Sequence, residues 1–68
     1  MAKSTNVMYD ALKSQFEAKK QSALANLTVY LSTPAGIGEH PDVLGAIQAE
    51  LDKICTNEER LDILNKHF

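Results

Sequence analysis

The side chains best suited to chemistry lie close together in the middle of the chain. Glu39, His40 and Asp42 are residue types that bind metal ions, but ligands this close together on a turn rarely achieve tetrahedral geometry. The glycines of Gly36-Ile37-Gly38 would suit a phosphate-binding loop only if a strand preceded them, whereas here a predicted helix does. We therefore expect no metal and no cofactor at this segment.

Cys55 is the only cysteine, so the chain cannot form an internal disulfide, which favours a reducing, cytoplasmic compartment. Nucleophilic catalysis would need a histidine and a third orienting group beside this thiol, in a pocket that excludes water. The spacing instead places Cys55 at the border of an apolar helix stripe, where a buried cysteine acts as a small hydrophobic residue. We expect no catalytic residues and no enzyme.

The elements around this segment are predicted by proline and glycine. Both prolines and all three glycines fall between Pro34 and Gly45, whereas the flanking segments are rich in good helix formers. The expected organisation is one domain, residues 1–68, with a helix over about 5–33, a turn over 34–40 and a helix over about 41–67. The fold class is all-α, an antiparallel two-helix hairpin resembling a coiled coil.

Signals at the helix ends support these bounds. Ser4, Thr5 or Asn6 can serve as the N-cap of the first helix, and Pro34 ends it at about Thr33. Pro41 suits the first helical position of the second helix, with Asp42 in its first turn. An alternative follows from the capping box that begins at Thr56, which could break the second helix and start a short third one. The heptad pattern keeps its phase there, which favours a continuous helix.

Apolar residues recur at three- and four-residue steps along both helices, and they predict the seam of the hairpin and of any oligomer. The small Ala23 should let the helices approach closely, and Leu51 and Ile54 should lie deepest. Counting back from the turn places Phe16 near Glu58 and Lys20 near Ile54. The predicted seam comprises Leu12, Phe16, Ala23, Leu27, Leu44, Ile47, Leu51, Ile54 and Leu61.

Two features of this pattern have alternative interpretations. Glu58 and Asn65 occupy seam positions, where they could specify register, or Glu58 could lean outward and pair with Lys19 or Lys20. In the turn, Gly36 and Gly38 could reverse the chain while Ile37 closes the core. Alternatively, Gly36, Ile37, Gly38, Glu39 and His40 could form an interaction site.

Composition narrows the classes of partner. Nine acidic and seven basic side chains give a net charge of −2, and we expect them to be spread along the whole chain. Nucleic-acid binding is disfavoured because it needs clustered basic residues, and Lys13, Lys19 and Lys20 are the only candidate strip. No stretch is apolar for long enough to predict a signal peptide or a membrane span. A chain of 68 residues buries a small core, which favours self-association.

The segment from Tyr30 to Asp42, with Gly36-Ile37-Gly38-Glu39-His40-Pro41 at its centre, precedes a Leu- and Ile-rich helix that ends Leu64-Asn65-Lys66-His67-Phe68. This pattern resembles small uncharacterised proteins of T-even-like tailed bacteriophages, especially marine cyanophages, in which an apolar-Gly-Ile-Gly-Glu-His-Pro turn separates two amphipathic helices. The resemblance implies a phage accessory protein that acts in the cytoplasm of the infected cell or on the virion. It implies no catalytic residues.

The expected function is therefore a non-enzymatic protein–protein interaction module. Its expected partners are a second copy of the chain and a host or phage protein, bound through the helical faces or the turn. Two alternatives stay open at this point, a structural component of the virion and a nucleic-acid-binding accessory factor that uses Lys13, Lys19 and Lys20.

Overall fold

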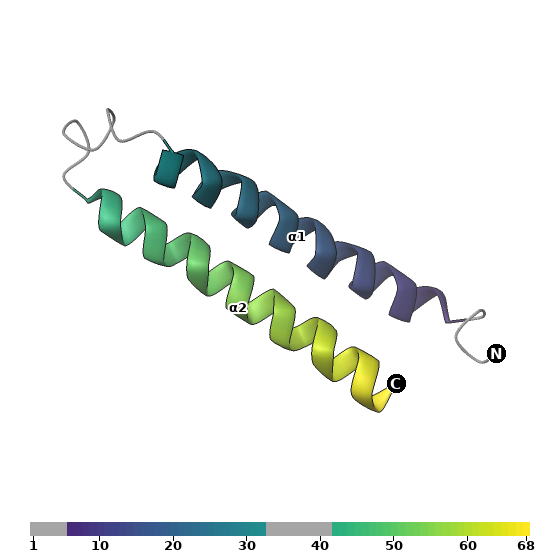
Figure 1. Ribbon diagram of the computed structural model, residues 1–68. Coiled ribbons are helices and arrows are strands. Elements are labelled where there is room, and N and C mark those ends of the chain that lie inside the picture. Colours follow the sequence, from purple (N-terminus) through teal and green to yellow (C-terminus); the bar gives the residue numbers. More distant parts are fainter. Residues whose placement is uncertain (1–5, 33–41) are drawn as a thin grey trace.

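The computed structural model describes residues 6–32 and 42–68, which form two helices. Helix α1 spans Val7–Ser32 and helix α2 spans Val43–His67. The helices lie side by side and run in opposite directions, so that the start of α1 and the end of α2 lie at the same end of the molecule (Figure 1). The molecule measures 52 × 15 × 14 Å. The predicted all-α helical hairpin is confirmed.

Helix α1 begins with a side-chain cap. The backbone N–H of Tyr9 donates to Oδ1 of Asn6 at 3.0 Å, so Asn6 is the N-cap among the candidates that the sequence offers. Asp10 lies in the first turn, where the helix dipole favours a negative charge. In the last described turn, the hydroxyl of Ser32 donates a hydrogen bond to the carbonyl oxygen of Thr28 at 2.6 Å.

Helix α2 begins later than the sequence predicts. Asp42 is its N-cap rather than part of its first turn, and the side chain of Asp42 makes no capping hydrogen bond. The helix then runs without a break through Thr56 and Asn57. The predicted continuous helix is confirmed and the alternative of a third helix starting near Thr56 is wrong. Lys66 and His67 lie in the last turn, where positive charge is favourable.

The helices meet along a seam of buried and half-buried side chains. Ala23 is 1% exposed and allows the close approach that the sequence predicts. Phe16, Leu27, Ile47 and Ile54 also lie on the seam as predicted, as does Leu61, and all five are half-buried. The full seam comprises Tyr9, Phe16, Lys20, Ala23, Leu27 and Tyr30 on α1, and Val43, Ile47, Glu50, Ile54, Asn57, Leu61 and Leu64 on α2.

Three residues of the predicted seam lie outside it. Leu44 and Leu51 are 71% and 44% exposed, and the buried positions beside them belong to Val43 and Glu50 instead. Leu51 is therefore not the deepest residue of α2, and Ile54 is only half-buried. The physical reason is that the apolar stripe of α2 is wider than one neighbouring helix can cover, so one edge faces α1 and the other faces solvent.

The third exception is Leu12, which is exposed one turn beyond Phe16, near the open end of the hairpin. The cross-helix contacts also differ from the predicted register. Phe16 contacts Arg60, two residues beyond its predicted neighbour Glu58. Lys20 pairs with Glu58, one turn beyond its predicted neighbour Ile54. The sequence-based count started from the turn, and residues 33–41 of that turn lie outside the described residues.

Candidate functional site

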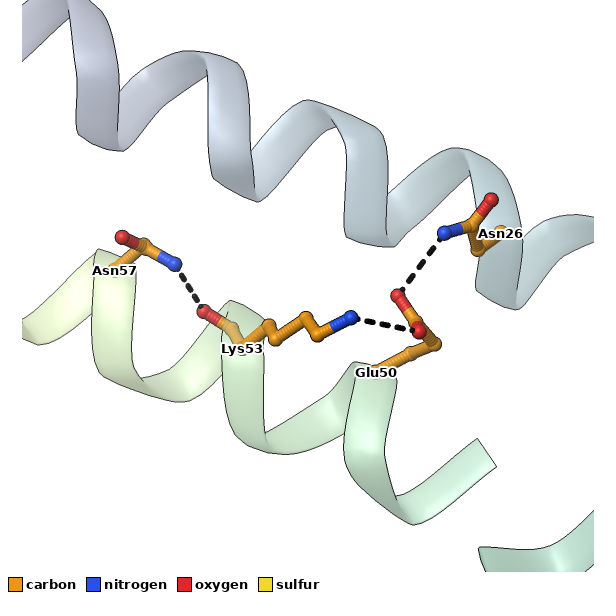
Figure 2. Close-up of polar contacts among 4 residues, drawn as sticks. All are labelled: Asn26, Glu50, Lys53 and Asn57. Carbon is orange, nitrogen blue, oxygen red and sulfur yellow. Dashed lines mark hydrogen bonds and ion pairs between the residues drawn. The ribbon is translucent and has the colours of Figure 1, made fainter. Parts of the chain in front are cut away.

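A buried carboxylate lies at the centre of the seam. Glu50 is 8% exposed, and its Oε1 accepts a hydrogen bond from Asn26 Nδ2 at 3.2 Å (Figure 2). Its Oε2 lies 3.1 Å from the Lys53 ammonium, one turn further along α2. The hydrogen bond from Asn26 and then that from Lys53 lower the pKa of Glu50, because both stabilise its charged form, although burial opposes them. Glu50 is therefore held as a carboxylate that joins the two helices.

Asn57 is the second buried polar residue of α2. It is 4% exposed, and its Nδ2 donates to the carbonyl oxygen of Lys53 at 2.7 Å (Figure 2). Its Oδ1 is buried and accepts no hydrogen bond from any residue that the structure describes. A buried acceptor without a partner costs about 1–3 kcal/mol. The seam thus contains a polar position that α1 does not satisfy.

Nearer the chain ends, two exposed contacts connect the helices. The Lys20 ammonium lies 3.5 Å from Glu58 Oε2, which confirms the prediction that Glu58 leans outward and pairs with a lysine of α1. The guanidinium of Arg60 lies 5.2 Å from the centre of the Phe16 ring, a cation–π contact. Such exposed contacts contribute at most about 1 kcal/mol each.

A groove of about 610 Å³ runs along one side of the seam. Its lining includes Lys19, Ser22 and Asn26 from α1 and Lys53, Asn57 and Arg60 from α2. Within residues 6–32 and 42–68, no group of three or more His, Cys, Asp and Glu residues could hold a metal ion. We call this surface the polar groove.

The opposite side of the seam carries four exposed leucines. Leu24, Leu31, Leu44 and Leu51 each directly follow a seam residue, whereas Ser22, Asn26 and Lys53 of the polar groove each directly precede one. Because successive helix residues are rotated by about 100°, the residues before and after a seam position lie on opposite sides of it. On both helices, the residues that directly precede seam positions line the polar groove. The residues that directly follow seam positions therefore lie together on the other side. We call Leu24, Leu31, Leu44 and Leu51 the leucine face.

The charged residues occur from Lys3 to Lys66, as expected, but they leave two segments of the hairpin uncharged. No charged residue occurs from Gln21 to Ser32 or from Val43 to Ala49. These two segments form the half of the hairpin next to the connection, and they contain the whole leucine face except Leu51, which lies at its border. In the open half, the same side of the molecule instead carries Asp10, Glu17, Glu58 and Asp62, each directly after a seam residue.

Other predicted residues do not form a site. Cys55 is exposed rather than buried, because it lies on the solvent side of Ile54. His67 is twelve residues further along the same helix, about 18 Å away at 1.5 Å per residue, so the two side chains do not meet. Gly36, Ile37, Gly38, Glu39 and His40 lie outside the described residues.

The lysines of the proposed phosphate-binding strip are separated. Lys19 lines the polar groove, whereas Lys20 pairs with Glu58 across the seam. Over the described segments, neither helix is apolar over a length sufficient to cross a membrane.

Sequence analysis missed the leucine face as a separate surface. The signal that could have found it is the absence of charge from residues 21–32 and 43–49, combined with leucines seven residues apart on each helix. Comparisons of the chain with protein-family models, with curated proteins and with solved structures gave no match. The proposal on function below therefore depends on the geometry of the described residues.

Proposed function

We propose that this chain is a non-enzymatic protein–protein interaction module that binds other protein chains through its leucine face. The observation that supports the proposal is the exposure of Leu31 and Leu44, at 67% and 71%, on helix segments 21–32 and 43–49, which contain no charged residue. Contiguous exposed apolar surface on a small protein is typical of an interaction site. We further propose that this module acts in an infected bacterial cell, as the resemblance to phage proteins implies.

The exposed leucines suit a helical partner. Leu24 and Leu31 are seven residues apart, as are Leu44 and Leu51, so the members of each pair lie two turns apart on the same side of their helix. Another amphipathic helix can pack its own apolar stripe against two such rows. The partner is thus expected to contribute leucine-like side chains at heptad spacing.

The test is a quantitative pull-down with tagged chains from cells that produce the protein. The variant Leu51→Glu places a charge on the leucine face, and Ile63→Glu is its matched control, because Ile63 is 46% exposed and directly precedes Leu64 on the opposite side. We expect the parent and Ile63→Glu to capture the same protein chains, including an untagged copy of the chain, at least about tenfold more than Leu51→Glu does. Equal capture by all three chains would contradict the proposal.

A further inference from the structure

We infer that the occupant of the leucine face is a second copy of this chain, packed antiparallel and staggered so that only the halves next to the connections overlap. This inference rests on the proposed function and specifies its partner. It assigns to each copy the same surface, Leu24, Leu31, Leu44 and Leu51, as a two-fold symmetric interface requires. The assembly is a short four-helix bundle with two hairpin arms that point in opposite directions.

The exposed area of the chain fits one such interface. The chain exposes 5188 Å². A compact monomer of 7.5 kDa exposes about 4200 Å² by the scaling of surface with mass. The excess of roughly 900 Å² is close to the roughly 800 Å² that each partner covers in a stable interface of standard size.

The distribution of charge selects the staggered arrangement. If two copies overlapped along their whole length, the interface would cover Glu58 and Asp62 together with Asp10 and Glu17. Two of these carboxylates already pair with exposed lysines, Glu58 with Lys20 and Asp62 with Lys66, and burying such pairs costs solvation energy that their attraction does not return. When only the halves next to the connection overlap, leucines meet leucines, and the carboxylates of Asp10, Glu17, Glu58 and Asp62 stay in water.

The position of the two-fold axis gives a measurable distance. Antiparallel overlap of the leucine faces places the axis near Ile47, which lies between Leu44 and Leu51. His67 is twenty residues from Ile47, so two copies of residue 67 are about 60 Å apart along the bundle at 1.5 Å per residue. Full antiparallel overlap, with the axis near the middle of α2, gives about 36 Å. Parallel packing leaves no axial separation.

The experiment combines mass with distance on the full chain. Light scattering of the parent should give twice 7.5 kDa, Ile63→Glu should give the same mass, and Leu51→Glu should give the monomer mass. Should Leu51→Glu lose its helical circular dichroism, Leu44→Glu takes its place, since an acid in the first turn of α2 favours the helix. Double electron–electron resonance between nitroxides on His67→Cys, in a Cys55→Ser background, should give a distance near 60 Å.

The outcomes separate this inference from the proposed function. A monomeric parent that still captures another protein through the leucine face overturns the second copy as occupant and leaves the interaction module intact. A dimer with label distances below about 40 Å overturns the staggered arrangement. A monomeric parent whose capture is insensitive to Leu51→Glu overturns both.

Discussion

Asn57 is a polar residue in a position where an apolar one would pack better. Its Nδ2 donates a hydrogen bond to the carbonyl oxygen of Lys53, which lies in the same helix. Its Oδ1 accepts no hydrogen bond from the described residues. Polar residues at seam positions lower stability, and in return they disfavour other registers. Glu50, two turns before Asn57 on α2, acts in this way, because the observed alignment brings Asn26 to Glu50.

The first prediction concerns this residue. Asn57→Leu should stabilise the fold by about 1–3 kcal/mol, because it removes a buried acceptor without a partner. The measurement is the midpoint of denaturant unfolding at fixed protein concentration. Asn65→Leu is the control, since Asn65 is exposed on the same helix and its replacement should change stability by less than about 0.5 kcal/mol. A destabilised Asn57→Leu would mean that Oδ1 has a partner in solution.

The second prediction concerns the acid sensitivity of the fold through Glu50. The pKa of Glu50 is lower in the folded chain than its ordinary value of 4.5, so the unfolded chain binds more protons as the pH falls below that value. The stability that Glu50 contributes is therefore present above about pH 4.5 and is lost as the pH falls through the folded-state pKa. Glu50→Gln should flatten the acid side of a plot of melting temperature against pH.

The control for the pH experiment is Glu59→Gln, which removes an exposed carboxylate from the same helix. This variant changes the net charge by the same amount as Glu50→Gln does, but it leaves the contacts of Glu50 in place. It should therefore keep the acid dependence of the parent. Equal slopes for the parent and Glu50→Gln would show that Asn26 and Lys53 do not hold the carboxylate in solution.

The distance between the two helices is set by Ala23. At 1% exposure its methyl group leaves no room for a longer side chain between α1 and α2. Ala23→Leu should therefore destabilise the hairpin by about 1–3 kcal/mol through overpacking. Ala25→Leu should change stability by less than about 0.5 kcal/mol, because Ala25 is exposed on the same helix. Thermal melts followed by circular dichroism compare the two, and equal melts would show that the helices do not meet at Ala23.

The sequence predicts the elements of this fold well, because proline and glycine positions and helix propensity act locally. The continuity of α2 through Thr56 could be predicted for the same reason, since the heptad phase outweighed one capping signal. The rotation of α2 could not be predicted. Leu44 and Leu51 form a heptad pattern with Ile47 and Ile54. Val43 and Glu50 form an equally regular pattern with the same two isoleucines.

The choice between those two alignments depends on contacts between helices. The Asn26–Glu50 hydrogen bond is one of these contacts, and periodicity within one helix contains no information about it. A pattern search also favours leucine over glutamate at a buried position, because a buried carboxylate is costly unless it is paired. The pattern therefore predicts Leu44 and Leu51, two of the four leucines of the leucine face, in the seam inside the hairpin.

At the scale of the whole molecule, two helices side by side form a single layer. Its core lies along one line, with solvent on both sides. Its extents of 52 × 15 × 14 Å leave every helix with a single helical neighbour in the described residues. A chain of this size gains little from its own core, so the second layer proposed above would add to its stability. The leucine face and the polar groove lie on opposite sides of the seam, and the four exposed leucines gather on the first of these sides.

The last prediction follows from that dependence on a second layer. If two copies fold together, unfolding separates them, and mass action makes the melting temperature rise with protein concentration. With about 2.1 cal/mol/K of unfolding entropy per residue, a dimer of 68-residue chains should gain about 5 °C for each tenfold increase in concentration. Calorimetric or circular dichroism melts over a wide range of concentrations measure this slope.

The variants give the slope its structural meaning. Leu44→Glu should melt below the parent and at the same temperature at every concentration, because a charge at this position prevents the leucine faces from meeting. Ile63→Glu, with its charge on the other side of the hairpin, should keep the slope of the parent. A parent whose melting temperature is constant over a hundredfold range of concentration would mean that the single hairpin is stable without a second layer, and the exposed leucines would then serve a partner other than a second copy.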